Sequence, residues 1–372
     1  MNELEKQAAK LFCVGFQGKS PPAELVELQA RGVSGAILFA RNIESPEQAA
    51  ELNLALKEKA PAPFLLSVDQ EGGRVMRLRA PFMPLPPMRV LGRAADPELA
   101  RRLGAAMGAE LRELGFDLDF APVLDVDTNP ANPVIGDRSF ARESELVSAL
   151  GAALIEGLQG AGIAACGKHF PGHGDTSQDS HLVLPSLPHA LERLEAVELP
   201  PFAAAIRAGV ATIMTAHVIF EALDARYPAT MTRPALDGIL RDRLGFDGVV
   251  ISDDLEMRAI ADNFGIEEAV VRGVNAGVDL FLVCHTPSKQ HEAIDALIHA
   301  VEDGRVERGR LEEAGRRIDR LVERFVRPAL PRPSPSLLGC EDHLALVAEI
   351  EARSGIRSHA LGPDPTASSR AG

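Results

Sequence analysis

Residues 248–257 read GVVISDDLEM, an apolar run that ends in two adjacent carboxylates, Asp253 and Asp254. A short apolar run rich in β-branched residues predicts a buried strand. Neighbouring side chains at a strand end point in different directions, so we expect only one of the two carboxylates to face inward. The residues alone leave open that both carboxylates simply cap a following helix.

Seven further apolar runs occur along the chain, separated by helical patterns. Ser-Pro at 45–46, Asp-Pro at 96–97 and Thr-Arg-Pro at 232–234 are typical of helix starts. Short strands that alternate with helices predict a parallel sheet with right-handed crossovers. The seven further runs cover residues 11–16, 35–39, 64–68, 118–122, 163–167, 211–215 and 278–283.

The ends of these runs help to decide between a closed barrel and an open, doubly wound sheet, which share the same alternation. Several runs lead directly into polar or charged residues. In a (β/α)8 barrel the functional side chains come from the carboxyl ends of several strands, which meet at one mouth. We therefore predict an α/β fold, a (β/α)8 TIM barrel. The residues that follow the runs are Asp69, Asp125, Lys168 with His169, His217 and Asp253.

The composition changes after the helical pattern of residues 311–326. Residues 327–335 read RPALPRPSP, which cannot continue a helix because proline lacks the backbone N–H and clashes with the preceding turn. We predict a catalytic barrel over residues 1–330 and an extension over 331–372. The extension is expected to contain a Pro-rich linker, a short helix at 341–354 that packs back on the barrel, and a disordered tail.

Charge and composition exclude several classes of partner. The chain has 372 residues and a net charge of −14, which repels phosphate backbones and anionic lipid surfaces. The first six residues read MNELEK, acidic where a secretory signal is positively charged, and no stretch of about 18 residues is continuously apolar. We therefore expect a cytoplasmic protein that binds neither nucleic acid nor a membrane.

Functional groups are densest in residues 168–181, KHFPGHGDTSQDSH, with three His, two Asp and one Lys. Proline and glycine at 171, 172 and 174 are incompatible with a helix, so after Phe170 we expect an exposed, mobile loop over the barrel mouth. A purely structural loop, or a divalent metal site, would also fit this composition. The ligands of such a metal would be His169, His173, Asp175, Asp179 and His181.

Two further segments place charged groups near the mouth. Residues 69–77 read DQEGGRVMR, in which an ionised Asp69 can accept hydrogen bonds from two neighbouring sugar hydroxyls. A salt bridge from Asp69 to Arg74 or Arg77 is the alternative. Residues 136–140 read GDRSF, in which the Arg138 guanidinium can offer a cationic fork to a carbonyl or a carboxylate.

Together these motifs resemble the family 3 glycoside hydrolases, and within that family the bacterial β-N-acetylglucosaminidases of cell-wall recycling. The strings DQEGGR, GDRSF, KHFPGHG, DSH and SDDL occur in family order between residues 69 and 255, and the likeness extends over residues 5–328. The two-domain glucosidases of the family take their acid residue from a second domain, for which no room follows residue 330. The resemblance therefore favours the glucosaminidase branch.

The resemblance implies a role for each residue of the motifs. Asp253 would be the nucleophile, and His181 the general acid/base, oriented by Asp179. Neither a metal nor an organic cofactor is implied, and the substrate would be a small carbohydrate or muropeptide with a terminal, non-reducing, β-linked N-acetylglucosamine. The positions that the resemblance assigns to sugar binding are Asp69, Arg77, Arg138, Lys168 and His169.

The use of histidine as the acid/base can also be argued from chemistry. Most retaining glycosidases use two carboxyl groups about 5 to 5.5 Å apart, one attacking the anomeric carbon and the other protonating the leaving oxygen. An imidazole, with an unperturbed pKa of about 6.5, can replace the second carboxyl. Asp179 can hold the ring of His181 and stabilise its charged form. A loop that carries His181 would close over the sugar and reopen for product release.

Alternatives remain at this level. A His acid/base repels an anionic acceptor less than a carboxylate would, so the same site could transfer the sugar to phosphate instead of water. The metal hypothesis would make the protein an amidohydrolase-like barrel with a different chemistry. A catalytically silent barrel would bind sugar without turnover.

Overall fold

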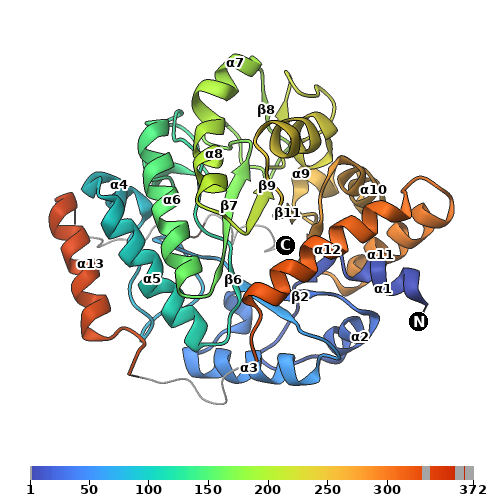
Figure 1. Ribbon diagram of the computed structural model, residues 1–372, viewed down its shortest axis with the longest axis horizontal. Helices are drawn as coiled ribbons and strands as arrows, with labels where there is room; N and C mark the ends of the chain where they lie inside the picture. The colour runs from blue at the N-terminus through green and yellow to red at the C-terminus, as the bar shows by residue number, and fades with distance from the viewer. Residues whose placement is uncertain (1, 329–335, 357–363, 365–372) are drawn as a thin grey trace.

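Eight parallel strands close into a barrel in the computed structural model, which describes residues 2–328, 336–356 and 364 (Figure 1). Their order around the barrel is β1-β12-β11-β9-β7-β6-β3-β2, so strands consecutive in the chain are neighbours in space. The predicted (β/α)8 fold is confirmed. The strands are β1 (Phe12–Val14), β2 (Gly35–Leu38), β3 (Leu65–Val68), β6 (Leu118–Asp119), β7 (Ala164–Phe170), β9 (Thr212–Thr215), β11 (Val249–Asp254) and β12 (Leu280–Val283).

Two of these strands extend beyond the apolar runs that predicted them. β7 continues through Lys168 and His169 to Phe170, and β11 continues to Asp254. The polar residues at these ends are therefore part of the barrel wall rather than of flexible loops. Strand backbone places side chains more rigidly than loop backbone does.

The ladders of β7 and β11 are irregular where these polar residues occur. On β7 the register to β9 shifts between Gly167 and Phe170, and on β11 the register to β12 shifts between Ile251 and Asp254. A bulge in a ladder re-aims the side chains that it carries. The strict alternation that we expected for neighbouring side chains therefore does not hold at these two strand ends.

Helices surround the barrel on its outside (Figure 1). The predicted starts at Ser45 and Asp96 are confirmed, because Ser45 Oγ accepts a hydrogen bond from Gln48 N at 3.2 Å and Asp96 Oδ1 from Glu98 N at 2.9 Å. The helices are α1 (Glu3–Ala9), α2 (Ala23–Arg31), α3 (Pro46–Lys59), α4 (Met88–Ala94), α5 (Pro97–Glu113), α6 (Ser144–Gly160), α7 (Leu191–Arg193), α8 (Leu199–Arg207), α9 (Arg258–Ala261), α10 (Ile266–Ala276), α11 (Pro287–Glu302), α12 (Arg308–Phe325) and α13 (Glu341–Ser354). Across the part of the chain that is described, none of them is both long and apolar enough to cross a membrane.

Some helical segments depart from the α-helical hydrogen-bond ladder. The helix predicted to start at 232–234 is a π-helix, η5 (Pro234–Arg243), and η3 (Leu194–Glu198) is a second π-helical segment. The spacing of apolar residues does not distinguish these wider turns from α-helix. The 3-10 turns are η1 (Ala40–Asn42), η2 (Gly136–Arg138) and η4 (Ala229–Met231).

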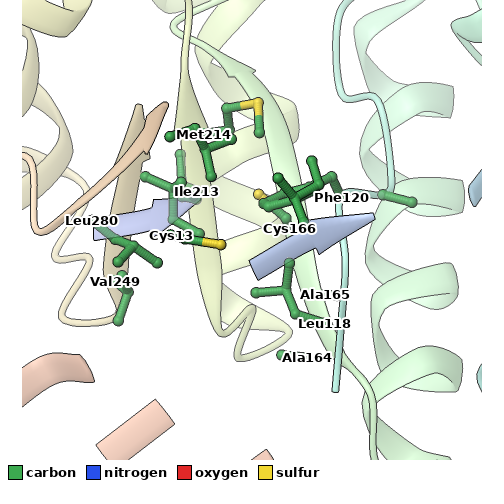
Figure 2. Close-up of a cluster of buried hydrophobic side chains, with 14 of the residues drawn as sticks. Cys13, Leu118, Phe120, Ala164, Ala165, Cys166, Ile213, Met214, Val249 and Leu280 are labelled. Atoms are coloured by element: carbon green, nitrogen blue, oxygen red, sulfur yellow. The ribbon is translucent and has the colours of Figure 1, made fainter. Parts of the chain in front are cut away.

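Side chains fill the inside of the barrel (Figure 2). The polar residues among them bond within the wall: Ser67 Oγ donates to Ala36 O and Thr212 Oγ1 to Ala165 O, each at 3.1 Å. A filled interior confines any binding site to the strand ends and the loops around them. The buried side chains labelled in Figure 2 are Cys13, Leu118, Phe120, Ala164, Ala165, Cys166, Ile213, Met214, Val249 and Leu280.

Two small sheets accompany the barrel. β4 (Gln70–Gly72) and β5 (Val75–Met76) form an antiparallel hairpin directly after β3. β8 (Ser186–Leu187) pairs in parallel with β10 (Ile219–Phe220). The second sheet joins the segment that follows β7 to the segment that follows β9, two neighbouring barrel strands.

Helix α13 lies against α4 and α5 on the outside of the barrel (Figure 1). His343 Nδ1 lies 2.6 Å from Glu110 Oε1, which ties the helix to α5. The helix predicted at 341–354 is therefore present and packs back on the barrel. The linker predicted at 331–335 lies outside the described residues, as does the predicted tail apart from Asp364, and the division into barrel and extension stays a prediction.

Candidate active site

The carboxyl ends of the barrel strands surround a cavity of about 60 Å³. Its wall comes from β7, β11, the hairpin after β3, the segment after β6 and the loop after β7. Of the residues that the resemblance assigns to catalysis and sugar binding, Asp179 alone does not line it; its carboxylate contacts His181, which does. The predicted residues that line the cavity are Asp69, Arg77, Arg138, Lys168, His169, His181 and Asp253.

Asp253, near the end of β11, presents an ionised carboxylate to this cavity. Burial alone would raise its pKa, but His217, His169 and His181 nearby lower it below the ordinary value of 3.8. Its Oδ1 accepts a hydrogen bond from the N–H of Asp254 at 2.8 Å. A carboxylate that stays ionised is chemically suited to nucleophilic attack.

Asp254 also lines the cavity, contrary to our expectation that only one of the two adjacent carboxylates would face inward. The register shift in β11 allows both to do so. The surroundings of Asp254 nevertheless differ, because its Oδ2 lies 3.1 Å from His285 Nε2 and its Oδ1 accepts the N–H groups of Cys284 and Glu256 at 3.1 Å each. Asp254 is thus committed to holding the strand ends, whereas Asp253 is not.

His181 lies in the loop after β7 with one ring nitrogen already occupied. Its Nδ1 is 2.8 Å from Asp179 Oδ1, which also accepts the backbone N–H of His181 at 2.8 Å. Burial would raise the pKa of Asp179, but these hydrogen bonds and the charge of His181 hold it below its usual range. The carboxylate therefore fixes the ring and leaves Nε2 for proton transfer.

A network of buried charges forms the floor on the side of β3. Arg138 binds Glu71 through two hydrogen bonds of 2.8 Å, and Lys168 Nζ lies 2.6 Å from Glu71 and 2.8 Å from Asp69. Burial would raise the pKa of Glu71, but Arg138 and Lys168 hold it well below its usual range. Burial would likewise lower the pKa of Lys168, which Asp69 and Glu71 raise instead. Glu71, Arg138 and Lys168 therefore keep their charges.

The structure refines what the sequence indicated for the arginines. The fork of Arg138 is turned to Glu71 within the protein, so it is not presented whole to a ligand. Arg77 Nη2 lies 3.5 Å from Asp69, so this salt bridge is one of the two weighed from the sequence, while Arg74 pairs with Asp137 at 2.9 Å. Asp69 retains a partly exposed carboxylate at the cavity.

His169 is held from behind by Asp125. Its Nδ1 lies 2.7 Å from Asp125 Oδ2, and Asp125 Oδ1 accepts the N–H groups of His169 at 3.2 Å and His173 at 2.7 Å. Burial would raise the pKa of Asp125, but His169 and His173 lower it. Asp125, which follows a predicted run, thus supports a site residue without lining the cavity itself.

The loop after Phe170 is less exposed than we predicted. Residues 171–174 are buried, and the exposed part begins only at Ser177. Asn132 from the segment after β6 donates to His173 O at 2.8 Å and Gly174 O at 3.1 Å. The expectation of an exposed loop was wrong for the first half of the loop, because contacts with another loop bury it. Sequence spacing cannot show such contacts.

Sequence reasoning missed part of the wall on the side of β12 and β2. His285 follows β12 and pairs with Asp254, while Phe39 follows β2. The Arg41 guanidinium lies 4.3 Å from the centre of the Phe39 ring and donates to Cys284 O at 2.6 Å. Their position at the ends of apolar runs could have identified them, because Phe39 ends one run and His285 follows another.

A carboxylate from the far end of the chain also reaches the site. Asp364 Oδ2 lies 2.5 Å from Arg77 Nη1, although the two residues are 287 positions apart in the sequence. The Arg77 side chain is almost fully buried and Asp364 is partly exposed. Arg77 therefore holds carboxylates from two parts of the chain, Asp69 and Asp364.

The arrangement does not favour the metal hypothesis. Within residues 2–328, 336–356 and 364, no group of three or more His, Cys, Asp or Glu side chains is placed to hold a metal ion. The five side chains named as ligands pair elsewhere instead. Their partners are Asp125 for His169, Thr176 and Ser180 for His173, Thr128 and His189 for Asp175, and each other for Asp179 and His181.

Comparison with known proteins relates the chain to one family. The family described as "Glycosyl hydrolase family 3 N terminal domain" matches residues 3–321. A β-hexosaminidase of Nitrosomonas eutropha is 41% identical over 313 residues, which cover 81% of this chain and 89% of that protein. A β-hexosaminidase of Thiobacillus denitrificans is 45% identical over 271 residues, 71% of this chain and 75% of the relative.

Solved structures give a similar result. A glycoside hydrolase family 3 β-N-acetylglucosaminidase from Paenibacillus superposes with a TM-score of 0.92 at 42% identity, covering 95% of this chain and 69% of that one. NagZ from Neisseria gonorrhoeae, solved in complex with N-trifluoroacetyl-D-glucosamine, superposes with a TM-score of 0.77 at 34% identity. The match covers 92% of this chain and 98% of the NagZ chain.

Proposed function

The chain belongs to glycosyl hydrolase family 3, and on that premise we propose that this glycoside hydrolase is a retaining exo-β-N-acetylhexosaminidase that releases terminal, non-reducing, β-linked N-acetylglucosamine. Relatives named β-hexosaminidase support the reaction. The similar structure that holds N-trifluoroacetyl-D-glucosamine supports an acetamido sugar as the group recognised.

One observation carries the proposal: an ionised carboxylate and an imidazole with one nitrogen fixed line the same cavity. Asp253 comes from β11 and His181 from the loop after β7, and the two are close enough for the imidazole to lower the pKa of the carboxyl. Retaining hydrolysis needs a nucleophile and a proton donor on one sugar. These two residues supply both.

In the first step Asp253 attacks the anomeric carbon and the bond to the leaving oxygen breaks. His181 donates the proton on Nε2 to that oxygen, and the sugar stays bound as an ester of Asp253. Asp179 stabilises the imidazolium before transfer and keeps the ring in place. In the second step His181 takes a proton from water, whose oxygen attacks the anomeric carbon and releases Asp253 as a carboxylate. Two inversions give net retention.

The charged network at β3 is proposed to bind the hydroxyls of the sugar. Asp69 is an acceptor for two neighbouring hydroxyls, while Lys168 and Arg77 hold it in place. His169, fixed through Nδ1 by Asp125, offers its other nitrogen to the ligand. Arg138 acts through Glu71, which it and Lys168 position together.

As the natural substrate we propose small muropeptide fragments, hydrolysed in the cytoplasm. The resemblance of the motifs to the cell-wall recycling branch of the family supports this source. The net charge of −14 is consistent with a small soluble substrate rather than a polyanion.

A panel of chromogenic β-glycosides tests the proposed function. We expect turnover of the N-acetylglucosaminide, less of the N-acetylgalactosaminide and little of the glucoside, with β-configured product at early times. Adding phosphate should change neither rate nor product. Preference for the glucoside, or release of a sugar phosphate, would contradict the proposal.

A further inference from the structure

The segment that carries His181, residues 177–184, contributes Ser180 and His181 to the wall of the cavity. It also includes the exposed apolar side chains of Leu182 and Val183.

Within this segment the hydrogen bonds are mostly internal. Asp179 accepts the backbone N–H groups of His181, Leu182 and Val183, so the segment is a compact turn that can move as a unit. Ser180 makes its hydrogen bonds to other parts of the protein. Among the described residues, no other member of 177–184 does so.

Ser180 is held at two points. Its Oγ lies 2.9 Å from His173 Nε2, and its backbone oxygen accepts the N–H of Ala259 at 3.3 Å. Ala259 belongs to α9, the short helix that follows β11 and therefore follows Asp253. Ser180, the residue next to His181, is thus connected to the base of its own loop through His173. It is also connected, through Ala259, to the short helix that follows Asp253.

His173 is a fixed partner. It is buried, its N–H donates to Asp125, its oxygen accepts from Asn132, and its Nδ1 lies 2.8 Å from Thr176 Oγ1. Burial and the neighbouring His169 lower its pKa to about 4, so the ring is neutral near neutral pH. A neutral ring bonds Ser180 without attracting the carboxylates nearby.

We propose that the hydrogen bond between Ser180 Oγ and His173 Nε2 is a latch that holds His181 in position to protonate the leaving oxygen. This inference rests on the proposed function. Ser180 and His173 also line the cavity, but in this account they are positioning residues, because they act through His181.

Substrates with different leaving groups test the latch. A dinitrophenyl N-acetylglucosaminide needs no proton donor, whereas a methyl N-acetylglucosaminide does. In Ser180→Ala we expect kcat/KM, which reports the first chemical step, to fall about fivefold for the methyl glycoside, as for one lost hydrogen bond, and to change less than about twofold for the dinitrophenyl glycoside. Ser177→Ala, an exposed serine of the same loop with no hydrogen bond, should match the wild type for both.

Hydrogen exchange gives a second measurement on the same variants. The N–H of Ala259, which donates to Ser180 O, should exchange faster in Ser180→Ala than in the wild type or Ser177→Ala, because displacement of the turn breaks that hydrogen bond. If Ser180→Ala does not fold, Ser180→Cys, nearly equal in volume with a weaker hydrogen-bonding group, should show the same pattern to a smaller degree.

The outcomes separate the latch from the proposed function. A wild type that hydrolyses neither glycoside contradicts the function itself. The latch is wrong, while the function stands, if kcat/KM depends on the leaving group in His181→Ala but not in Ser180→Ala. The same conclusion follows if Ser180→Ala lowers kcat/KM for both glycosides by the same factor.

Discussion

Asp253 and Asp254 are identical in chemistry and adjacent in the chain, yet their surroundings separate them. Asp254 is taken up by His285 and by two backbone N–H groups, so its oxygens are occupied. Asp253 receives one backbone hydrogen bond and faces three imidazoles that keep it ionised. Environment and not residue type therefore makes Asp253, rather than Asp254, the carboxylate suited to the proposed role of nucleophile.

Replacing His181 should affect substrates according to their leaving groups. In His181→Ala we expect kcat/KM for a methyl N-acetylglucosaminide to fall about 10²- to 10⁴-fold, because the proton donor is lost. For a dinitrophenyl glycoside the fall should be much smaller. Steady-state kinetics with both substrates measures the difference.

The pH profile of the same variant gives an independent check. As the pH rises the acid loses the proton that it must donate, so wild-type kcat/KM for the methyl glycoside should decline on the basic side, a decline absent from His181→Ala. His299→Ala, an exposed histidine on α11, is the control and should keep the wild-type profile. An unchanged basic limb in His181→Ala would count against its role as acid.

Asp119 makes the stability of the protein depend on pH. It is fully buried at the end of β6 and accepts a hydrogen bond from Gln70 N at 2.9 Å. Burial, only partly opposed by that hydrogen bond and by Lys168, raises its pKa to about 8. Above pH 3.8 the unfolded chain releases this proton while the folded protein keeps it. The free energy of unfolding therefore falls as the pH rises towards about 8.

Asp119→Asn should remove that pH dependence, because the amide keeps the acceptor for Gln70 but does not ionise. The wild type should lose stability as the pH rises, and the variant should not. Relative to the wild type, we therefore expect the melting temperature of the variant to be higher at about pH 9 than at about pH 5, by about 2 °C or more. Thermal unfolding at both pH values measures it. A difference that is constant with pH would show that Asp119 does not titrate in this way.

At the scale of elements, the ends of β7 and β11 explain why the site is rigid. Both strands continue past their apolar runs and both change register at the polar residues. A bulge aims consecutive side chains at one cavity, which regular alternation would not permit. Asp253 and the pair Lys168 and His169 are thus placed by strand backbone, whereas His181 lies in the loop after β7.

The base of the loop after β7 depends on one glycine. A Cβ on Gly174 would lie 1.8 Å from Val126 O, a backbone atom that cannot yield without moving the loop. In Gly174→Ala we expect kcat/KM for the methyl glycoside to fall about 10²-fold, since small displacements of positioned groups are costly, together with a lower melting temperature.

Gly160→Ala is the matched control for this prediction. Gly160 is the last residue of α6, and an added Cβ would meet no atom within 4 Å. Its activity should be unchanged and its stability equal or higher, because alanine favours helix. Full activity in Gly174→Ala would show that the loop base tolerates displacement.

How far the sequence predicts the elements depends on how local the signal is. The apolar runs at 163–167 and 248–251 predicted strands because alternation of strand and helix is a local property. The π-helix η5 and the register shifts were not predicted, since they arise from hydrogen bonds whose pattern the spacing of apolar residues does not encode. The buried loop base was missed for the same reason, because Asn132 lies in another loop.

At the scale of the whole molecule, the closure of the barrel brings the site together. Glu71, Arg138 and Lys168 come from three segments, and only the closed barrel reveals that they form one charged network. The motifs led to Asp253 and His181 as predicted catalytic residues, but gave no sign that Arg138 faces Glu71. Asp364 had no sequence signal at all, because nothing near it suggests a partner 287 positions away.

Asp364 should compete with the substrate. Its carboxylate lies 2.5 Å from Arg77, a residue that we propose helps to bind the sugar. In Asp364→Ala we expect KM to fall about twofold to tenfold with kcat unchanged, because sugar binding no longer has to compete with the ion pair between Asp364 and Arg77. Asp342→Ala, an exposed carboxylate on α13, should leave KM unaltered. An unchanged or higher KM in Asp364→Ala would show that the contact does not oppose binding.

The central claim is that Asp253 forms the covalent bond to the sugar while His181 moves the proton. Mass spectrometry after reaction with a fluorinated N-acetylglucosaminyl fluoride tests it most directly, because the fluorine slows release of the intermediate. We predict an adduct of one sugar on the peptide that contains Asp253, and none in Asp253→Asn. A stable adduct on Asp254 or on another carboxylate, or turnover of the reagent by Asp253→Asn, would contradict the account.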